Sequence, residues 1–382
     1  AARTNLQLIY RNKLKIDHIN YRTIWCSEDG WSINIIDQDS LPGDFKVINL
    51  SSVQQVIGAI KTKIGKGRSV NMVMAMYGMA LAMKKDSSDE SIRSTAKALI
   101  SNYSGIEYIK NIVSELSMMI ASVPPDARQS LAYKKAKEMA DLDVEINNKI
   151  GDNGLSLIIN AHKNIRQNRS INLLTHGNAG WLTTVDWGTA LSTIFKSHGF
   201  GIPINVWVTE TIKGERECAL TCWELEQQGI SHEIIDDRAS AYMMQNGLVD
   251  MCMISADLMS AEGDVINNVG TYVKALAAKD NNIPFYIALP SSSIDWKLHA
   301  NLSVENTTER DKPDRLGIKN HIKNSANQSN IITADLLRDN FYSEVTPSGL
   351  ITGLITEKGY TSASAHGLAA LFPDLAPFVS LG

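Results

Sequence analysis

The fold is decided by residues 250–272, DMCMISADLMSAEGDVINNVGTY. The apolar run 251–254 predicts a short buried strand, and Asp257 follows where that strand would end. A turn around Gly263 then leads to a helical pattern at 272–278. In an open α/β sheet, ligands bind between the carboxyl ends of strands and the amino ends of helices, where free N–H groups suit a phosphate. The stretch therefore predicts a carboxylate beside an anion site, and a surface loop in which Asp257 caps a helix is the alternative interpretation.

The second half of the chain alternates short apolar runs with helical patterns. The predicted strands are residues 171–174, 204–208, 232–235, 251–254 and 285–289, and the predicted helices are 183–195, 217–228, 239–246 and 270–279. This alternation is typical of βαβ units in an α/β fold with a parallel sheet. Polar residues follow four of these strands, at 175–180, 209–211, 255–257 and 290–295. Because parallel strands end at one edge of their sheet, we expect a site at that edge. The sequence has neither the GxGxxG of dinucleotide sites nor the GxSxG of serine hydrolases.

The first half predicts a few strands followed by a helical bundle. Mixed aliphatic and aromatic runs at 6–10, 21–25 and 31–35 predict the strands. Helical patterns begin after Ser51 or Ser52, either of which can be the N-cap, and continue to about residue 168. Residues 128 to about 168 predict either one long helix or two helices with a break near residues 151–154, and that break is the candidate domain boundary. We therefore expect two domains, residues 1–150 with the strands and helical bundle, and residues 151–382 with the parallel sheet.

A glycine-containing basic loop, Lys63-Ile64-Gly65-Lys66-Gly67-Arg68-Ser69, precedes a predicted buried helix at 70–83. Two glycines among basic residues at a helix start can cradle a phosphate. An ordinary solvated turn between helices is the alternative.

Composition indicates an ordinary globular protein. Of the 382 residues, 44% are apolar and 20% are charged, and the net charge of −4 argues against a nucleic-acid partner. We expect no membrane partner, because no apolar run approaches the ~20 residues that span a bilayer, and we see no signal peptide. The four cysteines lack metal-ligand spacing, so we expect no metal and a cytoplasmic location.

Several ordered blocks of the sequence resemble the methylthioribose-1-phosphate isomerase family. The blocks are IIDQDSLP (35–42), KGRSVNMVMAMYGMALA (66–82), THGNAGWLTTVDWGTAL (175–191), WVTETIKGERECALTCWELEQQGI (207–230), ADLMSAEGDVINNVGTY (256–272), IPFYIALPSSSID (283–295) and EVTPSGLITGLITEKG (344–359). The resemblance extends from about residue 21 to residue 359. Ribose-1,5-bisphosphate isomerases and the regulatory subunits of translation initiation factor 2B are related to this family.

The resemblance implies a Rossmann-like catalytic domain at 151–382, in a homodimer, after a smaller N-terminal domain. It implies a phosphorylated pentose as substrate and no cofactor. The family converts a ring-closed aldopentose 1-phosphate to the 1-phosphoketose, as in methionine salvage. Since C1 carries the phosphate, the enzyme must assist ring opening before hydrogen moves from C2 to C1. A cysteine and a protonated aspartate in an apolar pocket serve this chemistry in the family.

Carried over position by position, the family's functional residues fit unevenly. The catalytic aspartate is Asp257, and the catalytic cysteine of THCNxG is replaced by Gly177. The positions that correspond to substrate contacts, or that flank the cysteine, are Lys66, Gly67, Arg93, Asn178, Gly180, Arg216, Asn267 and Asn268. Among them, Asn268 stands where the family has lysine and Arg216 where it has glutamine, so the positive charge of the phosphate pocket is kept.

The missing thiol leaves two functions open. A divergent isomerase that uses Asp257, and into which a restored thiol at Gly177 would fit, is the first. A non-catalytic regulatory member that binds a sugar phosphate or nucleotide is the second. The origin of Gly177 is also open: natural divergence and a deliberate replacement of the cysteine would both give glycine at this position. The group at the 5-position of the sugar is set by the shape of the pocket.

Overall fold

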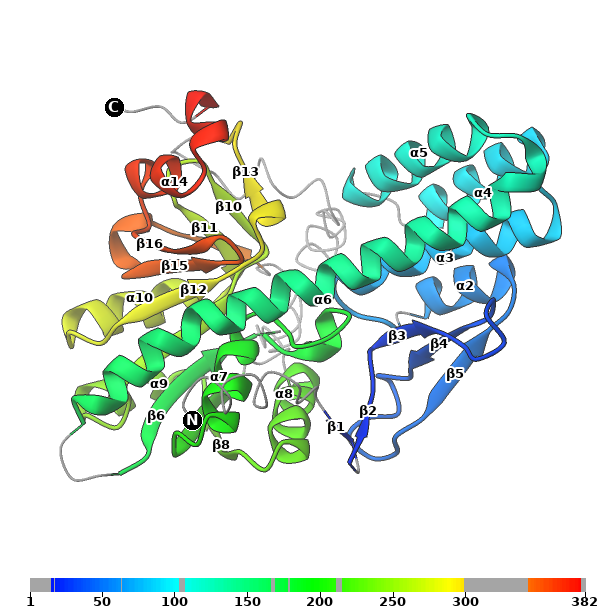
Figure 1. Cartoon of the computed structure of the whole chain (residues 1–382). Helices are drawn as coiled ribbons and strands as arrows, with labels where there is room; N and C mark the ends of the chain where they lie inside the picture. Colours follow the sequence, from blue (N-terminus) through cyan, green and yellow to red (C-terminus); the bar gives the residue numbers. More distant parts are fainter. Residues whose placement is uncertain are drawn as a thin grey trace, which may run out of the picture.

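The computed structural model describes residues 15–16, 18–62, 64–102, 107–165, 169–177, 179–210, 215–298 and 343–378. A small sheet and a helical bundle form the N-terminal part, and a parallel sheet covered by helices forms the C-terminal part (Figure 1). The predicted fold class, a Rossmann-like α/β sheet after a smaller β-plus-helical part, is confirmed. The strand predicted at residues 6–10 lies outside the described residues.

Short antiparallel strands and five helices make up the described N-terminal part. The strands are β1 (Lys15–Ile16), β2 (Ile19–Asn20), β3 (Ile24–Cys26), β4 (Ile33–Ile36) and β5 (Val47–Leu50), and the helices are α2 (Val53–Lys61), α3 (Arg68–Lys85), α4 (Asp89–Asn102), α5 (Glu107–Ala121) and α6 (Pro125–Lys163). Gly30, at φ +77°, makes the turn between β3 and β4. Ser52 is the N-cap of α2 and accepts a hydrogen bond from the Gln55 N–H at 3.3 Å. The Met- and Ala-rich helix α3 is buried at the centre of the bundle, as predicted.

Helix α6 is one continuous element of 39 residues that runs from the bundle to the C-terminal sheet (Figure 1). Of the two alternatives that the sequence left open, one long helix is therefore confirmed and a break near residues 151–154 is wrong. Gly151 and Gly154 instead allow α7 (Ala190–Gly199) to pack closely, since a Cβ on Gly154 would lie 2.2 Å from Cγ2 of Thr193. The division of the chain into two domains near residue 150 stays a prediction.

The C-terminal part is built on a seven-stranded sheet in the order β16-β15-β12-β9-β6-β7-β8. Its strands are β6 (Ile171–His176), β7 (Ile204–Glu210), β8 (Ser231–Asp236), β9 (Met251–Ser255), β12 (Phe285–Ala288), β15 (Gly353–Thr356) and β16 (Gly359–Thr361). All neighbours are parallel except β15 and β16. The remaining helices are α8 (Glu215–Gln227), α9 (Ala239–Gln245), α10 (Thr271–Asp280) and α14 (Ala365–Leu371). The five predicted strands are thus confirmed.

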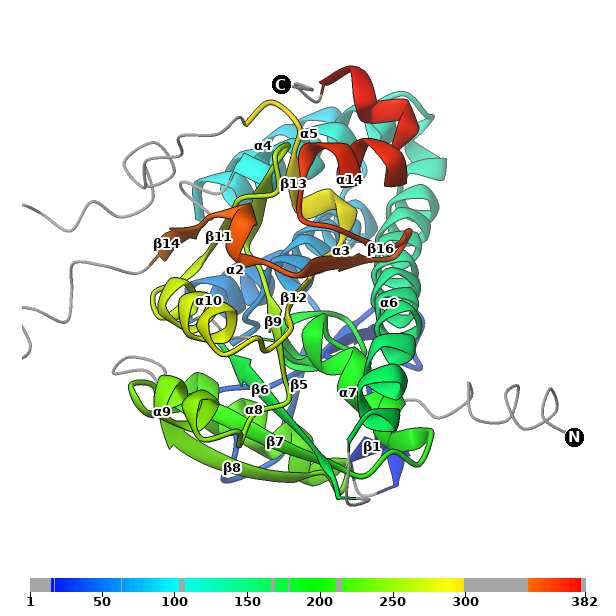
Figure 2. The ribbon, with the colours of Figure 1, turned by 90° about the vertical axis from the view of Figure 1, so that its left-hand side faces the viewer.

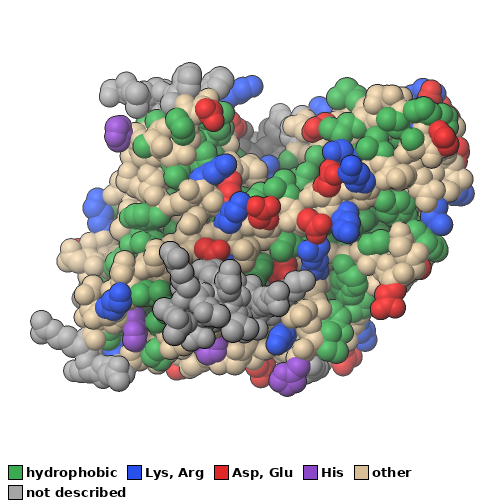
Figure 3. Space-filling model, in the orientation of Figure 1, with side chains coloured by type: hydrophobic (Ala, Val, Ile, Leu, Met, Phe, Trp, Pro, Cys, Tyr) green, Lys and Arg blue, Asp and Glu red, His purple; other side chains and the backbone are tan. Residues whose placement is uncertain are grey.

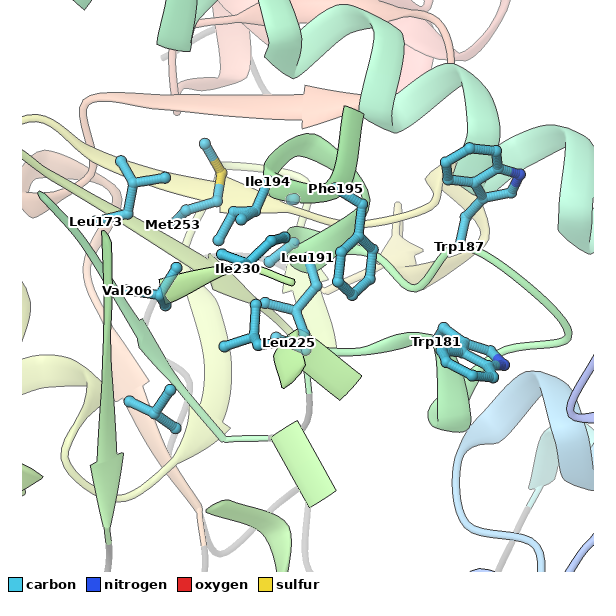
Figure 4. Packing of buried hydrophobic residues seen from close by; sticks show 14 of the residues in the cluster. Leu173, Trp181, Trp187, Leu191, Ile194, Phe195, Val206, Leu225, Ile230 and Met253 are labelled. Carbon is cyan, nitrogen blue, oxygen red and sulfur yellow. The ribbon is translucent and has the colours of Figure 1, made fainter. Parts of the chain in front are cut away.

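Successive residues of these strands enter two cores on opposite faces of the sheet. Leu173 belongs to the core beneath α6, α7 and α8, while Leu174 belongs to the core beneath α9 and α10. Figure 2 shows α7 and α10 on opposite sides of the sheet. In Figure 4, side chains of β6, β7 and β9 meet Leu191, Ile194 and Phe195 of α7. Burial on both faces explains the nearly continuous apolar runs that marked these strands in the sequence.

The turn expected around Gly263 is present, and it connects the two strands of a hairpin. Strands β10 (Leu258–Ser260) and β11 (Val265–Asn268) pair antiparallel, and Gly263 turns between them at φ +91°. Strands β13 (Ile294–Asp295) and β14 (Ser343–Thr346) complete this second sheet, in the order β13-β10-β11-β14.

The segment after β6 also differs from the prediction. Residues 183–195 were expected to be helical, but α7 begins at Ala190. The 3₁₀ turn η1 (Trp181–Thr183) and an irregular loop precede it, and two buried indoles, Trp181 and Trp187, pack this segment into the core (Figure 4). Further 3₁₀ turns are η2 (Ser291–Ser293), η3 (Ser348–Leu350) and η4 (Pro373–Phe378).

Acidic and basic side chains lie interspersed along α6 on the face drawn in Figure 3. Among the described residues, no helix combines the length and the apolar character that crossing a bilayer would take.

Candidate functional site

The polar segments predicted to share one edge of the sheet do so. In the register of the parallel strands, His176 at the end of β6 lies beside Thr209 of β7, and Glu210 lies beside Asp236 at the end of β8. Ser255 ends β9 in the same direction, and Asp257 follows it. The carboxyl edge of the sheet is therefore the candidate site.

Gly177 and Asn268 are direct neighbours at this edge. Gly177 follows β6 at φ +70°, a left-handed conformation that favours glycine. A Cβ built on it would lie 3.0 Å from Nδ2 of Asn268. The position that holds cysteine in the resembling family therefore faces the amide of a predicted substrate contact.

The hairpin β10–β11 is tied back onto the end of β9 by two hydrogen bonds. The buried Asn267 side chain donates from Nδ2 to the Ser255 carbonyl at 2.7 Å, and the Asp257 N–H donates to the Ile266 carbonyl at 3.2 Å. These bonds place Asp257 and Asn268 at the same edge. Asn267 uses its amide to hold the backbone, while the Asp257 side chain is exposed in the single chain.

The basic loop of the N-terminal part contacts the segment after β6. Gly67 adopts φ +106°, and a Cβ on it would lie 2.0 Å from the Thr183 carbonyl oxygen, so only glycine fits this approach. The neighbouring Lys66 Nζ lies 4.0 Å from Oδ1 of Asp39. Arg68 begins α3 and lies over the Tyr108 ring, 4.6 Å from its centroid. The contact at Gly67 brings this loop toward the carboxyl edge of the sheet.

The predicted cations do not all gather there. Arg93 lies on α4 within the helical bundle, where its exposed guanidinium pairs with Glu90 at 3.0 Å. Arg216 lies in the first turn of α8, but its side chain is outside the described part of the structure. Asn178 is also outside the described residues.

The N-terminus of α10 is occupied by a carboxylate of the same chain. Oε1 of Glu344 accepts hydrogen bonds from the Gly270 N–H at 2.8 Å and the Tyr272 N–H at 2.7 Å. Strand β14 places this residue opposite Asn267 of β11. The phosphate cradle expected at this helix end is therefore wrong, because Glu344 already takes the free N–H groups.

Gly180 makes room for a buried carboxylate. A Cβ on Gly180 would lie 2.2 Å from Oε2 of Glu224, and this oxygen accepts a hydrogen bond from the Trp181 N–H at 2.6 Å. Burial raises the pKa of Glu224 to about 8, although the N–H groups of Trp181 and Leu182 act to lower it. Glu224 thus fixes the segment after β6.

The structure also brings together four residues that the sequence did not mark as one group. His176, Thr209, Asp237 and Lys274 lie beneath the edge, with Nδ1 of His176 2.8 Å from Oγ1 of Thr209 and 3.5 Å from Oδ1 of Asp237. Lys274 pairs closely with Asp237. Burial, then the Lys274 charge, lower the pKa of His176 to about 4, so the imidazole is neutral at pH 7. Polar residues after β6 and β8 could have suggested part of this group, but nothing in the sequence signalled that Lys274 points inward.

The cysteine of β9 does not replace the thiol missing at Gly177. Cys252 is buried on β9, and burial raises the pKa of its thiol to about 12, so it is protonated at pH 7. Within the described ranges there is also no group of three or more His, Cys, Asp or Glu side chains suited to a metal ion.

Comparison with known proteins agrees with this architecture. Residues 58–363 match the Initiation factor 2 subunit family. The chain is 40% identical over 364 residues to "Methylthioribose-1-phosphate isomerase" of Rhodospirillum centenum, which covers 95% of this chain and 97% of that protein.

Two solved structures have the same fold over 93% of this chain, each at 28% identity. They are the translation initiation factor eIF-2B, subunit delta, from A. fulgidus, covered to 100% with a TM-score of 0.78, and 5-methylthioribose 1-phosphate isomerase from Pyrococcus horikoshii, covered to 96% with a TM-score of 0.76. The chain therefore belongs to the Initiation factor 2 subunit family, together with methylthioribose-1-phosphate isomerases.

Proposed function

We propose that this protein is an aldose–ketose isomerase that converts 5-methylthioribose 1-phosphate, or a related ribose 1-phosphate, to the 1-phosphoketose. The observation that carries the proposal is the 40% identity to the Rhodospirillum centenum isomerase over nearly the whole of both chains. The position of Asp257 at the same edge of the sheet as Gly177 and Asn268, where such sheets bind ligands, supports it.

Asp257 acts as the general acid in this proposal. The carboxyl group donates its proton to the ring oxygen as the C1–O bond breaks, which opens a ring that the 1-phosphate otherwise keeps closed. Hydrogen then moves with its electron pair from C2 to C1, and the C2 hydroxyl becomes the carbonyl as its proton returns to the Asp257 carboxylate. Substrate and product therefore have the same composition. The Asp257 side chain is exposed in the single chain, not enclosed in the apolar pocket that the resemblance implied. In this proposal the bound sugar covers the carboxyl and so keeps it protonated.

The phosphate is held by the cations and amides that the family pattern assigns to it. Lys66 and Asn268 are the anchors best supported by geometry, because the Lys66–Gly67 loop contacts Thr183 and Asn268 faces Gly177. Charge-assisted hydrogen bonds of this kind contribute ~1.5–3 kcal/mol each. Asn178 and Arg216 complete the proposed set. Arg93, Gly180 and Asn267 are left out, because Arg93 pairs with Glu90, the space at Gly180 is filled by Glu224, and the Asn267 amide donates to the Ser255 carbonyl.

We further propose that the protein is a cytoplasmic homodimer. Large apolar side chains are exposed on β8, α9 and α10, where Ile234 is 52%, Tyr242 64% and Val273 57% exposed. Helices α9 and α10 pack against each other on one side of the sheet (Figure 2). A second copy would cover these side chains in a two-fold contact. The four free cysteines favour a reducing compartment.

A regulatory, non-catalytic member of the family is the second candidate. Gly177 favours it, because the position of the family's catalytic cysteine carries no thiol. The same edge would then bind a phosphorylated sugar or nucleotide without converting it.

Incubation of the purified protein with 5-methylthioribose 1-phosphate separates the two candidates. Formation of the 1-phosphoketose, followed by ¹³C NMR at C2, is the expected result. Saturable binding of the sugar phosphate by calorimetry, with no ketose formed, would favour the regulatory function.

A further inference from the structure

Four side chains lie beneath Gly177 and Asn268 and take no part in the mechanism described above. They are His176, Thr209, Asp237 and Lys274, and they are called the His176 cluster below. They come from β6, β7, the segment after β8, and α10, so one group of side chains joins four elements of the sheet edge.

Lys274 is the most deeply buried charged member, with 1% of its surface exposed. Its ammonium group pairs closely with Asp237 and donates to the Gly270 carbonyl at 3.1 Å. Gly270 adopts φ +106°, and a Cβ there would lie 2.9 Å from Nζ of Lys274 and 2.8 Å from Oδ2 of Asp237. The ion pair therefore fixes the turn between Asn268 and α10.

His176 connects this turn to the residue on the other side of the site. Its ring hydrogen-bonds Thr209 at 2.8 Å, and its Cε1 lies 3.2 Å from the point where a Cβ on Gly270 would stand. The next residue in the chain is Gly177. The spacing between Gly177 and Asn268 thus depends on contacts made by the His176 cluster.

The charges of the cluster argue for positioning and against anion binding. Lys274 and Asp237 are opposite charges in direct contact, and the imidazole is neutral at pH 7. The net charge of the three side chains is therefore close to zero, and it would attract a phosphate only weakly. A buried ion pair is also, on balance, seldom more stabilising than apolar side chains of the same volume. What the pair supplies is a fixed geometry.

We propose that Lys274, Asp237 and His176 are positioning residues for the isomerisation, which hold Gly177 and Asn268 at the spacing that the bound sugar requires. This inference rests on the proposed function. A displacement of ~1 Å at a reacting centre can lower a rate by ~10²-fold, so loss of the cluster should act on kcat.

The test is a charge-neutral double variant, Lys274→Met with Asp237→Asn, because a single change would leave one buried charge unpaired. The chain offers a matched control in the ion pair of Lys196 and Asp152, between α6 and α7. Side-chain exposure is 6% and 29% for the control pair and 1% and 27% for Lys274 and Asp237. Lys196→Met with Asp152→Asn therefore reproduces the loss of a buried pair away from the site.

Both double variants should keep the circular dichroism of the wild type. The control variant should keep its kcat, while the Lys274/Asp237 variant should lose ~10²-fold in kcat with little change in KM. Thr209→Val, which removes only the hydroxyl facing His176, should also lower kcat and provides the readout if the Lys274/Asp237 variant does not fold.

Wild-type kcat in the folded Lys274/Asp237 variant, or in Thr209→Val when that variant does not fold, would overturn the positioning role. An equal loss of kcat in the control pair would overturn it as well. Failure of the wild type to convert the sugar phosphate would refute the proposed function itself, which separates the two failures.

Discussion

Nδ2 of Asn268 lies 3.0 Å from the point where a Cβ on Gly177 would stand, and Gly177 is held at φ +70°. The first relationship joins two positions that are 91 residues apart in the sequence. The second means that any side chain at position 177 both strains the backbone and presses on the amide of Asn268. The thiol expected to fit freely at this position would therefore fit only at a cost.

Replacing Gly177 by cysteine should have two separable effects. The left-handed backbone should lower the free energy of unfolding by ~1–2 kcal/mol, measured by denaturant titration. The thiol should raise kcat, if the cysteine acts here as it does in the resembling family. Gly177→Ala is the matched control, because it carries the same strain without a sulfur atom. Equal kcat values for the Cys and Ala variants would argue against a role for the thiol.

The sequence predicted the elements whose residues are buried on both faces, and it failed where tertiary contacts override a local pattern. The runs of β6, β7, β9 and β12 are short and apolar, so their position was evident. The edge strand β8 was also predicted, although most of its residues are exposed. The glycines at 151–154 left a break in the helix open, but they serve the close approach of α7 to an unbroken α6. A local reading cannot distinguish these two uses of glycine.

The candidate site shows the same limit. Asp257 and Gly177 could be placed at one edge because each follows a predicted strand. The sequence could not show that the Lys274 side chain points inward, because α10 has apolar residues on several sides and a lysine is usually exposed. The hydrogen bonds from the α10 N-terminus to Glu344 could not be predicted either, because they depend on the pairing of β11 with β14, about 75 residues further along the chain.

Glu224 should make the stability of the protein depend on pH. Its pKa is raised by burial from 4.5 to about 8, so the folded state binds a proton that the unfolded state releases. Stability should therefore fall as the pH rises toward 8. The lowered pKa of His176 makes stability rise with pH, and the pKa of Asp143, raised by burial to about 6, makes stability fall with pH. Both of these effects lie mainly below pH 6.5.

The measurement is the Tm of the wild type and of Glu224→Gln between about pH 6.5 and pH 8. Gln keeps an oxygen for the Trp181 N–H but does not titrate. The Tm of the wild type should fall relative to the variant across this range. Parallel Tm curves would mean that Glu224 has an ordinary pKa.

The proposed dimer predicts that a charge on α10 separates the subunits. Val273→Asp places a carboxylate among the exposed apolar side chains of α9 and α10, where burial in an interface would be unfavourable. Sedimentation velocity should show a dimer for the wild type and a monomer for the variant. Met118→Asp, at a side chain 68% exposed on α5, is the control and should leave the dimer intact. A monomeric wild type at micromolar concentration would contradict the proposal.

The role of Asp257 is tested most directly by the initial rate of ketose formation from 5-methylthioribose 1-phosphate. The rates of the wild type, Asp257→Asn and Asp280→Asn are compared, the last being a control at an exposed carboxylate at the far end of α10. The wild type and the control should convert the sugar phosphate at the same rate. Asp257→Asn should lose ~10²–10⁴-fold, the usual contribution of general acid–base catalysis. Conversion by Asp257→Asn at the rate of the wild type would contradict the assignment of this aspartate as the acid.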